Sequence, residues 1–142
     1  MAVLMVVVQF VSLVLLALSA PILPESYLSL GLYMAAAVTG MFALQAMRRS
    51  KLRISPKVDP EAKLVTNGIY RFIRHPMYLS VILMGAAMLV NQYTPLRIGI
   101  FVTLVIDLLV KMLYEEQMLR KRFGDDYVEY KMHTKRLIPF VF

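Results

Sequence analysis

The sequence is organised around Leu64-Val-Thr-Asn-Gly-Ile-Tyr-Arg-Phe-Ile-Arg-His-Pro-Met-Tyr78, a polar stretch between two hydrophobic halves. Its Asn-Gly pair at Gly68 predicts a turn. Pro76 predicts the start of a helix, because its missing N–H would be unpaired in the first turn anyway. Arg74 and His75 then lie at a helix N-terminus, whose free N–H groups suit an anionic ligand group such as a carboxylate. The plain alternative is a basic loop beside a membrane, with an incidental histidine.

Composition indicates an all-α integral membrane protein. The chain has 142 residues, a length typical of one domain, and 59% of them are hydrophobic. The apolar residues are gathered in blocks instead of being spread by period. Without cysteine there is no disulfide framework, thiolate metal site or cysteine nucleophile, and we expect no metal. The net charge of +7 fits loops on the cytoplasmic side of a membrane more simply than a nucleic-acid partner.

Four apolar blocks predict about four membrane-spanning helices, over residues 1–20, 27–47, 76–90 and 96–113. The first block has no charge and lacks the basic start of a signal peptide. The third block, at ~1.5 Å per residue, is ~22 Å long, so either the ~30 Å hydrocarbon core thins or the helix begins below the surface. We therefore divide a single domain, 1–142, into a helical hairpin (1–47), a loop (48–75), a second hairpin (76–113) and a helical tail (114–142).

Basic residues are concentrated on one side of these blocks. Of the sixteen Lys and Arg residues, only Arg97 lies in a short turn, and the rest follow in the central loop or in the tail from Lys111. The positive-inside rule then places the loop, the tail and the N-terminus in the cytoplasm. The loop faces anionic lipid heads in any case, and its length, about 27 residues, is typical of a functional loop.

Small residues mark the second block. Ala36 and Gly40 are four positions apart, which favours the close approach of another helix. A lipid-facing surface of small residues is the alternative.

Charged residues mark the end of the fourth block. Asp107, Lys111 and Glu115 are each four apart and share one helical face. At that depth charges normally face a bundle interior or a wet cavity. Asp107 and Lys111 can pair, which leaves one carboxylate in excess. Glu115 and Glu116 stand on the same side as His75, where an acidic pair suits an ammonium, a ribose or a sulfonium-bearing ligand. Simple solvated charge is the alternative.

The tail reads as helical. Gly124 predicts the end of one helix and Asp125 the start of the next. Tyr127 and Tyr130 share a face, and the apolar residues 137–142 are expected to pack back on the bundle or enter the interface.

Two motifs of this chain resemble the isoprenylcysteine carboxyl methyltransferase family, to which phospholipid N-methyltransferases are related. They are Gly68-x-Tyr-x-x-x-Arg-His-Pro-x-Tyr78 and Glu115-Glu-x-x-Leu-x-x-x-Phe-Gly-x-x-Tyr-x-x-Tyr130, the second followed by Ile138-Pro-Phe140. The resemblance covers residues 62–142. The family often has glycine where this chain has Ser80, which puts a close helix contact there in doubt.

The resemblance implies a cytoplasmic pocket for S-adenosylmethionine, with S-adenosylhomocysteine as product. The residues that match the family's cofactor segments are Ala62, Lys63, Leu64, Val65, Tyr70, His75, Pro76, Met77 and Tyr78, together with Glu115 as the cofactor carboxylate. Lys111 falls where the family carries an arginine that handles substrate. Lysine keeps the charge but lacks the bidentate fork, which puts carboxylate clamping in doubt.

Methyl transfer from a sulfonium is a direct displacement, so the protein's main task is alignment. The acceptor implied is an isoprenylcysteine-type carboxylate or a phospholipid amine, which would enter laterally from the bilayer. A carboxylate needs no base, whereas an amine must lose a proton, for which Glu115, Glu116 and His75 are candidates. With Lys111 at the substrate, these residues are the predicted catalytic set.

Two other functions stay open. A membrane reductase using NADPH on a lipid or sterol could share this arrangement by distant resemblance, although no Gly-rich phosphate loop is present. A non-enzymatic lipid-binding bundle predicts no cofactor binding.

Overall fold

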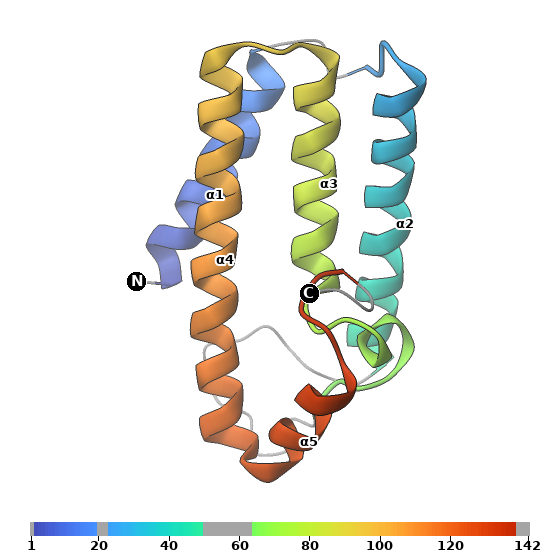
Figure 1. Ribbon diagram of the computed structural model, residues 1–142, viewed down its shortest axis with the longest axis vertical. Helices are drawn as coiled ribbons and strands as arrows, with labels where there is room; N and C mark the ends of the chain where they lie inside the picture. Colours follow the sequence, from blue (N-terminus) through green and yellow to red (C-terminus); the bar gives the residue numbers. More distant parts are fainter. Residues whose placement is uncertain (1, 20–22, 50–63, 139–142) are drawn as a thin grey trace.

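The structure, a computed structural model, describes residues 2–19, 23–49 and 64–138 and shows a helical bundle (Figure 1). Its elements are α1 (Ala2–Leu18), α2 (Tyr27–Arg49), the short 3₁₀ helix η1 (Gly68–Arg71), α3 (Pro76–Asn91), α4 (Pro95–Phe123) and α5 (Asp125–His133). Within the described ranges the extended structure is limited to one isolated bridge. The prediction of an all-α chain is therefore confirmed for these ranges.

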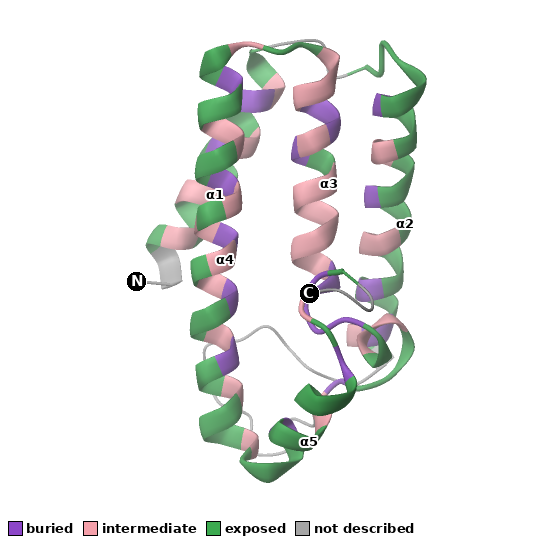
Figure 2. Ribbon diagram, in the orientation of Figure 1, coloured by how far each residue is buried: buried purple, intermediate pink, exposed green. Residues whose placement is uncertain are grey.

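The helices pack in two pairs, α2 with α3 and α1 with α4, and α5 folds under the lower end of α4 (Figure 1). The core between the pairs is formed by Leu16, Met88, Leu104 and Leu108. Buried positions face the inside of the bundle, and much of the outer surface is exposed (Figure 2). Many exposed side chains are large and apolar, as expected of a surface that faces lipid.

By length and composition, one helix of the described residues, over Tyr27–Arg48, is apolar and long enough to cross a membrane. The apolar stretches Leu4–Leu18 and Pro76–Asn91 are shorter. The four predicted spans thus correspond to four helices, but a crossing by all four stays a prediction.

Helix ends follow the local sequence. α3 begins at Pro76 as predicted, and α4 begins after Thr94, whose Oγ1 accepts the N–H of Arg97 at 3.3 Å. α4 then runs unbroken for 29 residues, so the predicted fourth span and the first part of the helical tail form one continuous helix. Gly124, with φ +53°, ends α4, and Asp125 begins α5 as predicted.

The small residues of α2 do receive a neighbouring helix. The Oγ of Ser80 on α3 donates to the carbonyl oxygen of Ala36 at 2.8 Å. A Cβ added at Gly40 would lie 2.8 Å from the same Oγ. The close approach predicted for this pair is confirmed, and the doubt raised by Ser80 is resolved because its hydroxyl itself makes the contact.

Arg97 holds the opposite end of the bundle together. It was predicted in a turn, but only 1% of it is exposed. Its Nη1 donates to the carbonyl oxygen of Gln92 at 2.9 Å and its Nη2 to that of Leu16 at 3.1 Å. These carbonyls lie at the C-terminal ends of α3 and α1, where the helix dipoles favour a cation.

Candidate functional site

The loop before α3 is held by the tail after α5. The N–H of Arg74 donates to the carbonyl oxygen of Lys135 at 2.7 Å, and that of His75 to Arg136 at 3.0 Å. In return the N–H of Lys135 donates to Phe72 at 3.1 Å. Leu137, the residue after Arg136, is buried, which agrees with the prediction that the tail packs back on the bundle. Residues 139–142 of the same predicted segment lie outside the described ranges. Loop and tail therefore form one layer across the lower end of the bundle.

His75 is the N-cap of α3, and Pro76 occupies the first helical position. The carbonyl oxygen of His75 accepts the N–H groups of Tyr78 and Leu79, both at 3.1 Å. The N–H of Met77 belongs to the first turn, where N–H groups have no partner within the helix. The predicted helix mouth is present, with His75 at its cap and the N–H of Met77 at its first turn.

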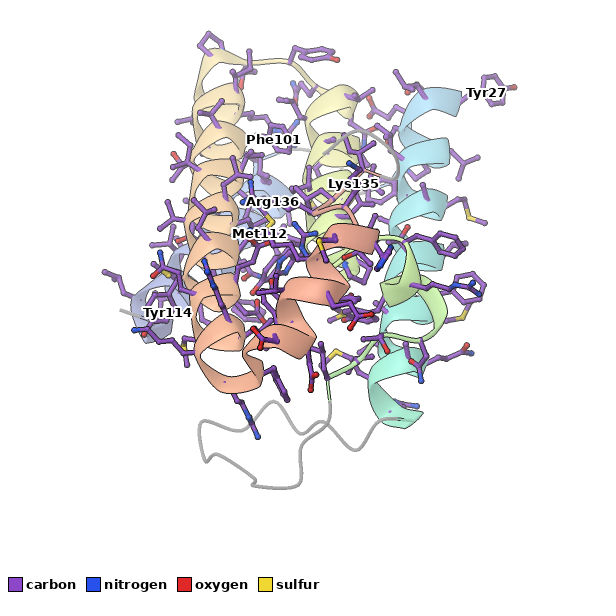
Figure 3. The ribbon with its side chains drawn as sticks, turned by 60° about the horizontal axis from the view of Figure 1, so that its bottom comes forward. Tyr27, Phe101, Met112, Tyr114, Lys135 and Arg136 are labelled. Carbon is purple, nitrogen blue, oxygen red and sulfur yellow. The ribbon has the colours of Figure 1, made fainter. Side chains whose placement is uncertain are left out.

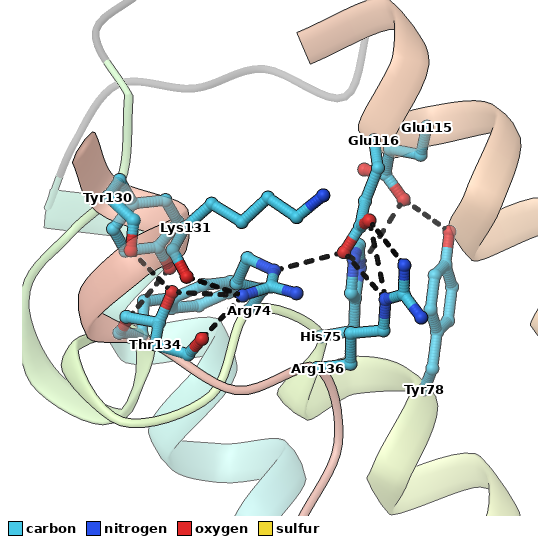
Figure 4. A network of polar contacts seen from close by, with 10 residues as sticks. Arg74, His75, Tyr78, Glu115, Glu116, Tyr130, Lys131, Thr134 and Arg136 are labelled. Carbon is cyan, nitrogen blue, oxygen red and sulfur yellow. Dashed lines mark hydrogen bonds and ion pairs between the residues drawn. The ribbon is translucent and has the colours of Figure 1, made fainter. Parts of the chain in front are cut away.

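Glu116 is the centre of a buried network that joins this loop, the tail and α4 (Figure 4). Its Oε1 lies 3.0 Å from Nε of Arg74, and its Oε2 lies 3.3 Å from Nη2 of Arg136. Nε2 of His75 lies 3.5 Å from Oε1, which is long for a hydrogen bond. Only 6% of Glu116 is exposed, so solvated charge is the wrong interpretation for this residue.

The electrostatics of Glu116 follow from these contacts. Burial alone would raise the pKa of its carboxyl, but the contacts with His75, Arg136 and Arg74 outweigh burial and lower the pKa to about 2. A carboxylate this acidic and this enclosed is a poor proton acceptor. The geometry favours a positioning role for Glu116 over the predicted role as a base.

Arg74 continues the same network into the tail. Its Nη1 donates to the carbonyl oxygens of Thr134 at 2.5 Å and Lys131 at 3.3 Å. Nε and Nη1 of Arg74 are therefore engaged inside the protein, and the side chain orders the segment that holds His75.

The neighbouring carboxylate, Glu115, is open. Its Oε2 accepts the hydroxyl of Tyr78 at 2.6 Å and lies 3.9 Å from Nδ1 of His75. The rings of His75 and Tyr78 are stacked, with centroids 5.4 Å apart and planes 10° apart. The Glu115 side chain is 45% exposed, in contrast to 7% for that of Glu116. Glu115 is thus fixed on one side and accessible on the other, as a ligand-binding carboxylate requires.

Lys111 lies one turn before Glu115, but its partner is not the one predicted. Its Nζ donates to Oε1 of Gln9 on α1 at 3.0 Å and lies 5.3 Å from the ring centroid of Tyr78. Among the ion pairs of the described residues there is none between Lys111 and Asp107. Oδ2 of Asp107 is buried and has no hydrogen-bond partner among the residues that the structure describes. The pairing of Asp107 with Lys111, left open by the sequence, is absent.

Tyrosines of the loop and the tail adjoin this site. The hydroxyl of Tyr130 donates to the carbonyl oxygen of Tyr70 at 2.7 Å. Burial, and secondly the charge of Glu115, raises the pKa of Tyr70 to about 12, so its phenol is neutral at pH 7. The rings of Tyr127 and Tyr130 have centroids 6.2 Å apart, which confirms that they share a face.

The structure brings most of the predicted residues to one place. His75, Pro76, Met77, Tyr78 and Glu115 surround the start of α3. Val65 is buried and Leu64 half-buried before η1, whereas Ala62 and Lys63 lie outside the described ranges.

Figure 3 shows Arg136 and Met112 within the bundle, and Tyr27 and Tyr114 projecting outward. The sequence interpretation missed Arg136, Thr134 and Gln9. Gln9 alone carried a signal, as the strongly polar side chain of the first apolar block.

Residues 25–126 match the family model described as phospholipid methyltransferase. This chain belongs to the phospholipid methyltransferase family. Among curated relatives, protein-S-isoprenylcysteine O-methyltransferase B of Arabidopsis thaliana is 34% identical over 80 residues, which are 56% of this chain and 41% of the relative. The corresponding enzyme of Schizosaccharomyces pombe is 28% identical over 96 residues, 62% of this chain and 38% of the relative.

A further relative has a different acceptor. Methanethiol S-methyltransferase 1 of Bradyrhizobium diazoefficiens is 36% identical over 72 residues, 51% of this chain and 25% of the relative. The matched segments thus span between 25% and 41% of the length of these three relatives. The phospholipid methyltransferase family match begins at residue 25, so all of α1 precedes it.

Proposed function

We propose that this chain is an S-adenosylmethionine-dependent methyltransferase that acts on a lipophilic or lipid-anchored acceptor at the cytoplasmic face of a membrane. The observation that carries the proposal is the open carboxylate of Glu115, hydrogen-bonded to Tyr78 at the start of α3, beside the enclosed carboxylate of Glu116. Family membership and the names of the relatives support methyl transfer over the reductase and the non-enzymatic bundle.

The residues at the start of α3 fit S-adenosylmethionine. This cofactor carries an ammonium, a carboxylate and ribose hydroxyls. The accessible side of Glu115 suits the ammonium or the hydroxyls, and the N–H of Met77 at the first turn of α3 suits the carboxylate. The side chains of Met77 and Tyr78 supply apolar surface, and Tyr70 supplies a neutral phenol. Leu64 and Val65 precede them on the loop, as the predicted cofactor segment requires.

The bound cofactor supplies a methyl group on a sulfonium, which the acceptor displaces directly. The protein therefore needs to align the acceptor and exclude water, and no covalent protein nucleophile is required. Glu116 contributes by holding Arg74 and His75 in place, since its own oxygens are engaged. Glu115 is the carboxylate left to receive a proton when the acceptor is an amine, and a carboxylate acceptor loses none.

The acceptor class follows from the surroundings. The outer surface of the bundle is apolar, so a substrate with a long hydrocarbon chain can remain in the bilayer while its polar end reaches Tyr78. Lys111 lies beside the Tyr78 ring and suits a negatively charged polar end. We assign an isoprenylcysteine-type carboxylate as acceptor, with a phospholipid amine as the second candidate because the matching family model is that of phospholipid methyltransferases.

The proposal is tested with the purified full chain in detergent or liposomes. Radiolabelled S-adenosylmethionine is incubated with S-farnesylcysteine or a total lipid extract, and labelled product is extracted into organic solvent. Calorimetry with S-adenosylhomocysteine and with NADPH separates the alternatives. We expect transfer of label and binding of S-adenosylhomocysteine. Binding of NADPH alone would establish the reductase, and binding of neither would establish a lipid-binding bundle.

A further inference from the structure

Gln9 and Lys111 form a polar contact between α1 and α4. The Nζ of Lys111 donates to Oε1 of Gln9 at 3.0 Å, and the bond is partly buried. Gln9 is the strongly polar side chain of the first apolar block, and it lies before the residues that match the family model. A half-buried polar side chain in such a helix is costly unless it is paired, so its partner indicates its purpose.

The hydrogen-bond partner of Lys111, the amide of Gln9, is neutral. Within the described residues no carboxylate lies within ion-pair distance of its ammonium, even though Asp107 is four positions away on the same helix. An amide oxygen fixes the position of an ammonium without cancelling its charge. A lysine ammonium has three donors, and Gln9 accepts one of them. The attraction between Lys111 and Asp107 acts at longer range than an ion pair, so the remaining donors stay available to an anion.

Lys111 is also directed at the site. Its Nζ lies 5.3 Å from the ring centroid of Tyr78, within the range of a cation–π contact. The hydroxyl of that same ring donates to Glu115, and the ring stacks on His75. The ammonium is therefore held between α1 and the tyrosine that borders the proposed cofactor site.

We propose that Gln9 is a positioning residue that holds the Lys111 ammonium, uncancelled, beside Tyr78 for the anionic end of a lipophilic acceptor. The inference rests on the proposed function and deepens it, because it makes an anionic acceptor, such as a carboxylate, the preferred class. A single lysine lacks the fork of arginine. The amide of Gln9 compensates by restricting where that lysine can point.

The test uses Gln9→Glu, Gln9→Leu and, as a matched control on the same helix, Ser12→Ala, each in the full chain. Ser12 is buried on α1 and is not part of this contact. The probes are S-farnesylcysteine and its uncharged carboxamide. Their affinities are measured by calorimetry in detergent, together with the affinity for S-adenosylhomocysteine, the melting temperature, and KM and kcat for methylation.

Gln9→Glu separates positioning from structure. A merely structural bond would be kept or strengthened by an ion pair, with unchanged acceptor binding. Positioning of an uncancelled charge predicts an unchanged melting temperature and S-adenosylhomocysteine affinity, with a loss of roughly ten- to a hundredfold in affinity for the carboxylate and a raised KM. Binding of the carboxamide stays within about twofold in every variant.

Gln9→Leu frees the ammonium without cancelling it, so we expect a smaller loss of carboxylate affinity and a lower kcat. Wild-type affinity for the carboxylate in Gln9→Glu would overturn the inference, and so would a loss of the same size in Ser12→Ala. If Gln9→Glu does not fold, wild-type carboxylate affinity and kcat in Gln9→Leu overturn it instead. A wild-type chain that binds the carboxylate over the carboxamide but transfers no methyl refutes the proposed function alone.

Discussion

Arg74 and Glu116 form a buried ion pair in which Nε and Oε1 are 3.0 Å apart, and their side chains are 6% and 7% exposed. They are 42 positions apart in sequence, so the pair fixes the loop before α3 to α4. Because Arg136 shares the same carboxylate, one acidic group compensates two guanidinium groups.

Glu116→Gln is expected to destabilise the fold by about 3–5 kcal/mol, because the buried guanidinium of Arg74 and the half-buried one of Arg136 lose their counter-charge. The measurement is the midpoint of thermal or denaturant unfolding in detergent. Glu129→Gln, an exposed carboxylate on α5, is the matched control and should change little. Equal stability of the two variants would contradict the assigned role of Glu116.

The contribution of Glu116 to the stability of the fold should depend on pH. Its pKa is lowered from 4.5 to about 2 in the folded protein, so the contribution is fully present above about pH 4.5 and is lost as pH falls toward 2. The difference in melting temperature between wild type and Glu116→Gln should therefore shrink over that interval. A difference that stays constant down to the lowest pH measured would rule out this titration.

Cofactor affinity should depend on His75 and Glu115. His75→Ala and Glu115→Gln each remove a contact with a charged or strongly polar group, with an expected loss of ~1.5–3 kcal/mol, or roughly ten- to a hundredfold. The affinity for S-adenosylhomocysteine should fall more than that for the acceptor. His133→Ala, at the other histidine and exposed on α5, is the control for the first variant. Unchanged affinity in both folded variants would refute the pocket.

The contact of α2 and α3 should tolerate no added methyl group. Gly40→Ala places a Cβ 2.8 Å from Oγ of Ser80, which is held by Ala36, and we expect a loss of about 1–3 kcal/mol. Gly31→Ala is the control on the same helix, since nothing lies within 4 Å of its added Cβ. Ser80→Gly combined with Gly40→Ala should recover stability. No recovery would show that the strain lies elsewhere.

Topology is tested by cysteine labelling, because the chain has no cysteine of its own. Single cysteines at Lys57, which lies outside the described residues, and at Lys131 should react with an impermeant maleimide from the cytoplasmic side alone. A cysteine at Tyr93, 66% exposed between α3 and α4, should react from the opposite side. Labelling of Lys57 or Lys131 from outside would contradict the proposed orientation.

Sequence reasoning located the helices well because their limits are set locally. Pro76, Gly124 and the apolar blocks act within a turn or two of themselves, and each helix end lies close to its prediction. The change from apolar to charged residues after residue 113 marks the end of the predicted span, but it does not end the helix. Both segments have good helix formers, so α4 continues to Phe123.

The part of the site that was predicted correctly also depends on local sequence signals. His75, Tyr78 and Glu115 were found from helix position and from the family motifs. Glu115 is accessible and Glu116 is enclosed. This difference depends on Arg136, which is close to Glu116 in space but distant in sequence. Adjacent positions on a helix point about 100° apart, so one carboxylate turns into the network while the other faces outward.

The pairing of the loop with the tail has a consequence for biogenesis. His75 is held by the backbone of Arg136, so the segment at the proposed site acquires its partner only after 61 further residues have been synthesised. The helices up to α4 emerge from the ribosome first and can enter the membrane while that partner is still being made. Assembly of the site therefore occurs late in synthesis. A ribosome stalled within α5 would leave a bundle in which the N–H of His75 still lacks the carbonyl oxygen of Arg136.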